Sequence, residues 1–122
     1  MARTFMRIVG IVLVVVGLVG FVDPLKGIFD LTVTHNLVHL LTGAIALMVS
    51  RSSVQSVWYA RIFGVLYLAV AVAGLVTGNL FGLIPLMPAD TVLHFLLAVS
   101  ALSIGFAVRP RGRVAASSAP TV

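Results

Sequence analysis

The three histidines of this 122-residue chain have a spacing that suits metal chemistry. His35 and His39 are four residues apart, which places both imidazoles on one face of a helix, about one turn from each other. Asp90 and His94 repeat this spacing with a carboxylate in the first position. Imidazoles on adjacent turns can hold one metal ion, and imidazoles with a carboxylate suit Zn, Fe, Cu or Mn. The first hypothesis is a metal site formed by His35, His39, Asp90 and His94.

The rest of the chain is strongly apolar. Hydrophobic residues make up 61% of it, charged residues only 9%, and the mean hydropathy is +1.21. Soluble domains carry about 25% charged residues. A chain of this length cannot hide so much apolar surface from water, so its solvent must be lipid. The lack of cysteine excludes disulfides, zinc–thiolate sites, iron–sulfur clusters and thiol nucleophiles.

The apolar segments predict an all-α fold, a bundle of four transmembrane helices in one domain over residues 1–108. The expected helices cover about residues 5–22, 34–49, 58–76 and 90–108. The first segment lacks a small-x-small cleavage signature, so we expect a retained helix rather than a signal peptide. Residues between the first two helices are expected to form a loop or re-entrant segment. Residues 109–122 are expected to be a basic, disordered cytoplasmic tail.

Basic residues are distributed unequally between the two sides of this topology. One side carries seven arginines, namely Arg3, Arg7, Arg51, Arg61, Arg109, Arg111 and Arg113. The loops on the other side carry only Lys26. This imbalance predicts a bacterial plasma-membrane protein with both termini in the cytoplasm. The arginines would orient the chain and contact anionic lipid, so a nucleic-acid partner is not expected.

The two halves of the chain are similar to each other. Residues 7–10 (Arg-Ile-Val-Gly) align with residues 61–64 (Arg-Ile-Phe-Gly). Further aligned pairs, with one residue of slippage along the way, are Gly20 with Gly74, Gly27 with Gly82, His35 with Asp90, and His39 with His94. This order predicts an internal two-fold repeat of helical hairpins in parallel orientation, with an axis along the membrane normal.

Three motifs resemble those of a known bacterial family. They are His-Asn-x-x-His-Leu-x-x-Gly at residues 35–43, Arg-x-x-Gly-x-x-Tyr at 61–67 and Asp-x-x-x-His at 90–94. Together they resemble the small four-helix membrane proteins, mainly actinobacterial, that are catalogued as domain of unknown function 4383. The resemblance covers roughly residues 5–108 and implies the four-helix topology. It implies no activity and no cofactor.

Two alternatives to the four-residue metal site remain open. His39 and His94 alone could be the axial ligands of a haem in the bundle core. A purely structural interpretation makes Asp90 and Thr34 the N-caps of their helices and leaves the histidines in hydrogen bonds between helices. Ionisable residues inside a membrane are uncommon, so the histidines and Asp90 stay candidates for function in either case.

Small residues recur inside the expected helices. They are Gly10, Gly17, Gly20, Gly43, Gly64, Gly74, Ala101 and Gly105. Such residues let helix backbones approach closely in a membrane, either within one bundle or against a partner. We expect mainly packing within the bundle.

No pattern in the sequence predicts catalysis. The chain has no Glu, no Gly-rich phosphate loop and no Ser-His-Asp arrangement, because its serines lie far from the histidines. A proton pathway is also disfavoured, since the cytoplasmic halves of the second and fourth helices offer only serines. We therefore expect a protein that is not an enzyme. The favoured function is an accessory or scaffold subunit of a larger membrane complex or a homo-oligomer; the alternative is a protein that binds a transition metal or haem.

Overall fold

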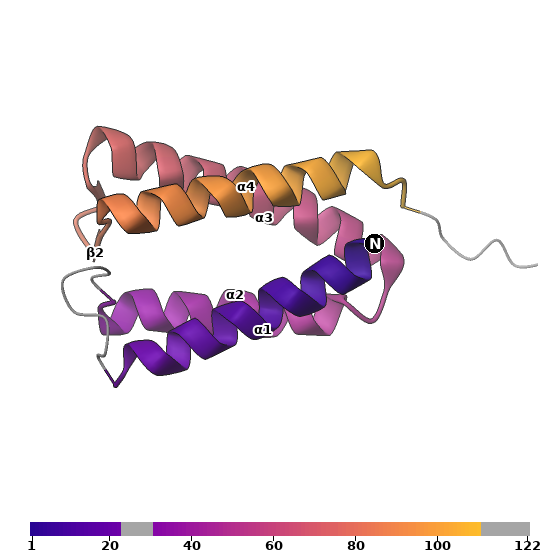
Figure 1. Ribbon diagram of the computed structural model, residues 1–122, viewed down its shortest axis with the longest axis horizontal. Coiled ribbons are helices and arrows are strands. Elements are labelled where there is room, and N and C mark those ends of the chain that lie inside the picture. The colour runs from indigo at the N-terminus through magenta and orange to yellow at the C-terminus, as the bar shows by residue number, and fades with distance from the viewer. Residues whose placement is uncertain (23–30, 111–122) are drawn as a thin grey trace, which may run out of the picture.

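The computed structural model describes residues 1–22 and 31–110 of the chain. Its four helices are α1 (Ala2–Gly20), α2 (Val33–Val49), α3 (Ser53–Val76) and α4 (Pro88–Ala107) (Figure 1). Two short antiparallel strands, β1 (Asn79–Leu80) and β2 (Ile84–Pro85), form a small hairpin between α3 and α4. The predicted all-α class is therefore confirmed, whereas the strands were not predicted.

The helix starts depend on caps that differ from those expected. The Thr32 side chain accepts a hydrogen bond from the backbone N–H of His35 at 3.3 Å, so Thr32 is the N-cap of α2 and the prediction of Thr34 is wrong. Ser52 accepts from the N–H of Gln55 in the same way at 3.4 Å. This cap lets α3 begin at Ser53, five residues before the expected start. The predicted loop or re-entrant segment lies largely in residues 23–30, and the predicted tail largely in 111–122, outside the described residues.

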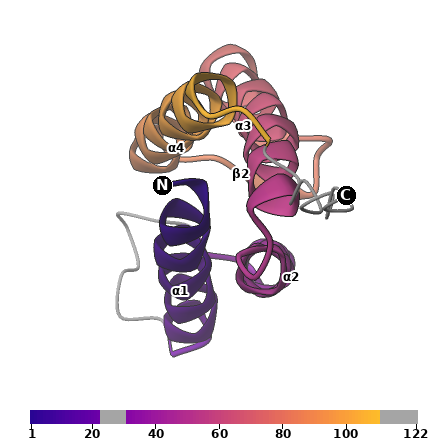
Figure 2. The same ribbon diagram turned by 90° about the vertical axis from the view of Figure 1, so that its right-hand side faces the viewer.

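The helices form two hairpins stacked on each other. α1 packs along α2, and α3 packs along α4, whereas contacts between the two pairs are much less extensive. Figure 1 shows the α1–α2 pair below and the α3–α4 pair above, with the ends of both hairpins aligned. Figure 2 views the bundle end-on and places α2 and α4 at diagonal corners. The predicted arrangement of two hairpins thus brings the outer ends of α2 and α4 to the same level.

Glycines allow the close approach of α1 and α2. A Cβ atom added at Gly10 would lie 2.9 Å from the backbone oxygen of Gly43, and one added at Gly43 would lie 2.9 Å from the oxygen of Gly10. Gly17 faces Leu40 and the backbone of Asn36 in the same interface. Each of these positions is too close for any larger residue without movement of the backbone.

Matching contacts occur in the second hairpin. Gly64 packs against Leu102 as Gly10 packs against Leu47, and Gly74 leaves room for Thr91 as Gly20 leaves room for Asn36. Gly105 faces Arg61, and Ala101 is fully buried. All eight predicted packing residues thus lie at helix contacts within the chain. The recurrence of these contacts supports the internal repeat, which stays a prediction.

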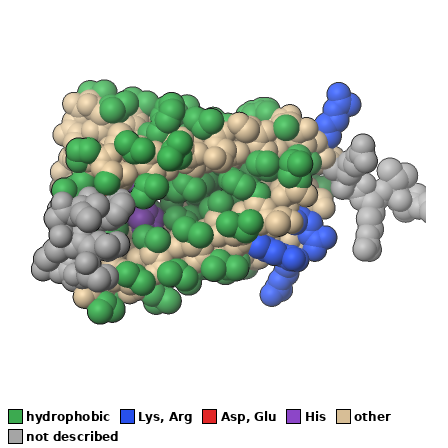
Figure 3. Space-filling view, in the orientation of Figure 1, with side chains coloured by type: hydrophobic (Ala, Val, Ile, Leu, Met, Phe, Trp, Pro, Cys, Tyr) green, Lys and Arg blue, Asp and Glu red, His purple; other side chains and the backbone are tan. Residues whose placement is uncertain are grey.

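The outer surface of the bundle is that of a membrane protein. α1, α3 and α4 are long and apolar enough to cross a bilayer, and α2, with 17 residues, is apolar but shorter. Large apolar side chains are exposed on all four helices, from Ile8 on α1 to Phe106 on α4. Figure 3 shows this apolar surface, with the arginine side chains gathered at one end. Water-soluble monomers rarely expose apolar patches beyond about 300–600 Å², so this surface contacts lipid.

The described arginines lie at one end of the bundle, together with the N-terminus, the α2–α3 connection and the end of α4 (Figure 3). The Nε of Arg3 donates to the carbonyl oxygen of Ser50 at 3.0 Å, and the Nε of Arg61 donates to the oxygen of Gly105 at 2.7 Å. The Arg61 guanidinium also lies 4.8 Å from the ring of Trp58 and 4.9 Å from that of Phe106. Arg111 and Arg113 lie outside the described residues.

Buried side chains fill the centre of the bundle near the arginine end and in the middle. Met6 and Phe63 are buried there, and Phe63 belongs to a cluster with Val9, Leu13 and Tyr67. On α3, Tyr59, Phe63 and Tyr67 follow one another at four-residue spacing, and the last two rings stack at 4.0 Å. This aromatic column leads along the bundle axis toward the histidines.

A candidate metal centre between the two hairpins

Three imidazoles meet between the hairpins at the end opposite the arginines. His35 and His39 come from the first two turns of α2, and His94 comes from the second turn of α4. One nitrogen of each ring lies within 4.8 Å of a nitrogen of both others. The ring centroids are 4.4 Å apart for His35 and His39, 5.8 Å for His35 and His94, and 6.2 Å for His39 and His94. Three of the four predicted metal ligands are therefore together.

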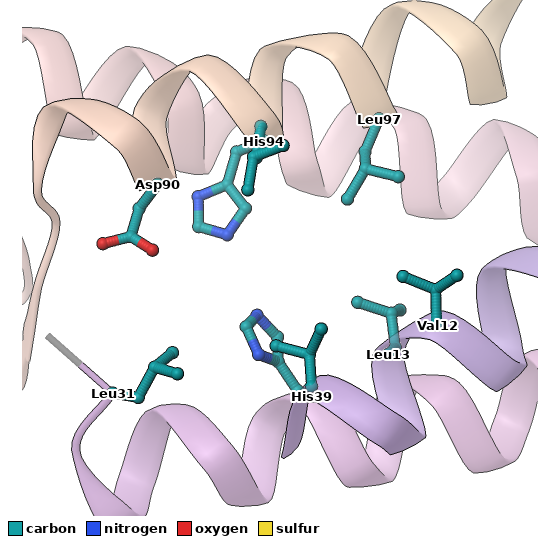
Figure 4. Close-up of a pocket in the computed structure, with 9 residues that line it drawn as sticks. Val12, Leu13, Leu31, His39, Asp90, His94 and Leu97 are labelled. Carbon is teal, nitrogen blue, oxygen red and sulfur yellow. The ribbon is translucent and has the colours of Figure 1, made fainter. Parts of the chain in front are cut away.

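Asp90 lies beside this trio and has a second role in the helix. Its Oδ2 accepts a hydrogen bond from the backbone N–H of Met87 at 3.1 Å, which holds the first turn of α4. Met87 is the N-cap, so the prediction of Asp90 at that position is wrong by three residues. The carboxylate lines the same cavity as His39 and His94, and Figure 4 shows these three side chains pointing into it. Asp90 is not part of the three-histidine group.

The histidines are buried and have unused hydrogen-bonding atoms. Their side chains are only 3–6% exposed. Within residues 1–22 and 31–110, the Nδ1 atom of each ring has no hydrogen-bond partner. A buried polar atom without a partner costs about 1–3 kcal/mol. Three such atoms in one place favour a bound group that uses these nitrogens over a self-contained polar network.

A tyrosine supports the trio from α3. The Tyr67 ring meets the His94 ring edge-on, with centroids 5.3 Å apart. Its hydroxyl lies 3.3 Å from the hydroxyl of Thr42, which in turn donates to the carbonyl oxygen of Val38 at 2.8 Å. The hydroxyl of Tyr59 donates to the carbonyl oxygen of Thr42 at 2.8 Å. Tyr67 therefore fixes the position of the His94 ring while its own hydroxyl is held by α2.

Two cavities border the imidazoles on opposite sides. One of about 180 Å³ lies toward α1 and α4 and is lined by His39, His94 and Asp90 together with apolar side chains. The other, of about 50 Å³, is lined by all three histidines and Tyr67 and is closed by residues of the β1–β2 hairpin, such as Leu80 and Ile84. The histidines thus form a partition between a larger and a smaller space.

Sequence reasoning missed several polar residues near the site. Asn36 and Thr91 are buried one residue after His35 and Asp90, where they fit against Gly20 and Gly74. Their side chains are matched in the repeat alignment, which was the signal that could have found them. Tyr67 had a signal in its four-residue spacing from Tyr59 and Phe63, because that spacing predicts one helix face.

Comparison with known families agrees with the motifs around this site. The model of the family described as "Domain of unknown function (DUF4383)" matches residues 3–107. The chain belongs to this family. All three histidines and Asp90 lie inside the matched part of this DUF4383 protein. No curated protein and no solved structure gives a significant match.

Proposed function

We propose that this membrane protein binds one transition-metal ion through His35, His39 and His94. The observation that carries the proposal is the meeting of three buried imidazoles whose candidate ligand atoms all lie within 4.8 Å of one another. Tetrahedral ligands at about 2.0–2.1 Å from Zn²⁺ are about 3.3 Å apart. Side-chain rotation that shortens the nitrogen–nitrogen distances by about 1.5 Å would therefore form the centre.

The ligand set favours Zn²⁺, Cu²⁺ or Fe²⁺ over Mg²⁺ or Ca²⁺. Neutral imidazole nitrogens suit the first group, whereas the second prefers oxygen ligands. Three protein ligands also leave a fourth position of a tetrahedral ion open. Asp90, next to the trio, supplies a negative charge that attracts a cation. We propose no catalytic step for the centre, in line with the expectation that the protein is not an enzyme.

A haem between His39 and His94 fits the geometry less well. Their 6.2 Å centroid separation suits two axial ligands. However, the adjoining cavity of about 180 Å³ is close to the size that holds a single benzene ring, about 150 Å³. A porphyrin is several times larger, and His35 lies beside both rings. Haem binding would require the hairpins to separate.

Metal analysis tests the proposal. The protein would be purified in mild detergent without chelator, its bound metals measured by mass spectrometry, and Co²⁺ added as a coloured substitute. We expect up to one metal ion per chain and visible Co²⁺ bands, both lost in His39→Ala and His94→Ala. Thr91→Val is the matched control, because it changes a buried polar residue on α4 that is not in the histidine group. A wild type that binds neither Zn²⁺ nor Co²⁺, or metal that survives both histidine substitutions, would overturn the proposal.

The orientation proposed for the protein follows from the arginine end. We propose that this end faces the cytoplasm of a bacterial plasma membrane, because seven of the eight basic residues belong to that side of the predicted topology. The histidines then lie near the outer face. Since the chain has no cysteine, single cysteines at Ser52 and at Leu83 would report the side by labelling with a membrane-impermeant reagent. Labelling of Ser52→Cys from outside would show that the orientation is the opposite of the proposed one.

An accessory role in a larger membrane complex is a second candidate function, compatible with the metal centre. The observation that favours it is the turn between β1 and β2. Phe81 is 91% exposed there and has a φ of 54°, an unusual conformation for a bulky residue. Leu83 beside it is 71% exposed. Co-purification under gentle conditions, compared between the wild type and Phe81→Ser, tests whether this tip contacts a partner or a second copy.

A further inference from the structure

An apolar groove runs from the lipid-facing side of the bundle to the histidines. It consists of two adjoining cavities between α1 and α4, of about 180 Å³ and about 250 Å³. Val12, Leu93 and Leu97 line both cavities, so the two cavities lie side by side along the same pair of helices. The second cavity continues toward the arginine end along Phe5 and Leu96.

This groove opens sideways to the bilayer. Val12, Leu93 and Leu96 are 48%, 46% and 57% exposed, although they line the groove. Figure 3 shows a histidine side chain at the bottom of the gap between the two hairpins, framed by apolar side chains. A molecule dissolved in the membrane can therefore reach the imidazoles without passing through water.

The groove is polar at one end only. His39, His94 and Asp90 are grouped around the first cavity, whereas the walls of the second are apolar apart from Ser100. The first cavity suits a head of about one six-membered ring, since a cavity of about 150 Å³ holds benzene. The second, elongated along the helices, suits an alkyl or isoprenoid tail.

We propose that the groove binds a membrane-dissolved hydroquinone, with its single ring at His39 and His94 and its tail between α1 and α4. The proposal rests on the proposed metal centre in one respect, because the open position of a three-histidine ion is the place for a hydroxyl oxygen of the ring. The neutral head both donates and accepts hydrogen bonds, which matches imidazole nitrogens on one side and a carboxylate on the other.

The test uses Co²⁺-loaded protein in detergent, titrated with decylubiquinol. We expect a saturable change of the Co²⁺ bands at about one ligand per chain. Dodecanol, which has a hydroxyl and a tail but no ring, should bind at least tenfold more weakly. Equal binding of dodecanol, or tighter binding of the anionic compound decanoate than of decylubiquinol, would overturn the assignment of a neutral ring head.

A matched pair of variants tests whether the ligand occupies the groove: one fills the groove with a large side chain, and the other makes the same change outside it. Leu93→Trp places a large side chain in the space shared by both cavities, and Val92→Trp makes the same change at the neighbouring position, which is 59% exposed and outside the groove lining. We expect Leu93→Trp to keep the Co²⁺ spectrum but to lose at least tenfold in affinity for decylubiquinol. Val92→Trp should behave as the wild type. A Co²⁺-loaded wild type without a saturable response, or a response unchanged in Leu93→Trp, would overturn the proposal.

Failure of the metal centre gives a separate result. If the wild type binds no Co²⁺, the proposed function fails, and the groove is judged by the rise in melting temperature that decylubiquinol produces. A rise that Leu93→Trp abolishes and Val92→Trp retains preserves the hydroquinone site. If decylubiquinol does not raise the melting temperature of the wild type, the hydroquinone site is rejected as well.

Discussion

Contacts within each hairpin differ in kind from contacts between the hairpins. Within α1–α2 the backbones approach so closely at Gly10 and Gly43 that a single added carbon would collide with a backbone oxygen. Between the hairpins, Phe63 and Tyr67 fill the centre of the bundle, whereas buried imidazoles and cavities occupy the end opposite the arginines, and a further cavity lies between α1 and α4. The first kind of interface leaves no room for a ligand. The second combines room with polar atoms, which is what a binding site needs.

The largest difference between the two interfaces is expected when one of the proposed metal-binding histidines is replaced. His94→Ala should weaken Zn²⁺ binding at least 100-fold, or about 2.8 kcal/mol, because each tenfold change corresponds to about 1.4 kcal/mol. The apo protein should keep its melting temperature, since His94 lies at the less extensive interface and its Nδ1 has no hydrogen-bond partner among residues 1–22 and 31–110. Zn²⁺ titration and thermal unfolding by circular dichroism measure the two quantities. A large loss of apo stability would mean that the trio is chiefly structural.

A glycine inside a hairpin should show the opposite pattern. Gly43→Val places carbons where the oxygen of Gly10 and the nitrogen of Val14 are 2.9 Å from the first added atom. Overpacking of this kind costs about 1–3 kcal/mol. Ala44→Val, at the exposed neighbouring position, is the control and should change stability little. Unfolding by increasing concentrations of a denaturing detergent measures the stabilities of the two variants. Equal stabilities would show that α1 and α2 are not closely packed.

A smaller effect is expected where the aromatic column meets the histidines. Tyr67→Phe removes the hydroxyl that lies 3.3 Å from Thr42 and keeps the ring against His94. Interhelical hydrogen bonds in membranes contribute about 0.6 kcal/mol on average, so stability should fall by about that amount. Zn²⁺ affinity should change less than threefold. A loss of Zn²⁺ binding comparable to that of His94→Ala would make the Tyr67 hydroxyl part of the centre.

The smallest effect is expected at the arginine end. Arg61→Lys removes the Nε–H that donates to Gly105 and weakens the contacts with Trp58 and Phe106. The loss should be at most about 0.5 kcal/mol, the lower end for cation–π contacts at exposed sites, because a lysine ammonium retains part of the contact with these rings. Metal binding at the other end should be unchanged in the same preparation. Altered Zn²⁺ affinity would show that the two ends are coupled.

The fold was predictable from the sequence because lipid imposes a simple pattern. Apolar segments of about 20 residues must be helices, and glycines among them mark close helix contacts. The four-residue spacings placed His35 with His39 and Asp90 with His94, and the repeat placed His94 opposite His39. Helix starts were less predictable, because Thr32 and Met87 depend on local backbone geometry that composition does not reveal.

The groove and the neighbours of the site were not predictable. The gap between α1 and α4 depends on how the two hairpins lean against each other, which no spacing within one helix encodes. Tyr67 and Asn36 stand in the motifs, but only the packing of α3 on α4 and of α2 on α1 brings Tyr67 to His94 and Asn36 to Gly20. The β1–β2 turn was missed because Phe81, which has a positive φ, occupies a position where Asn or Gly is typical.

The length of α2 determines how deep the histidines lie in a bilayer. Its 17 residues span about 25 Å at 1.5 Å per residue, which is less than the roughly 30 Å of a typical hydrocarbon core. Hydrophobic mismatch of this size is relieved by local thinning of the bilayer. Thinning would bring the headgroups down to His35 and within about 6 Å of His39, counted along the helix. A hydrated cation could then reach the imidazoles from the headgroup layer, while the groove stays in contact with the acyl chains.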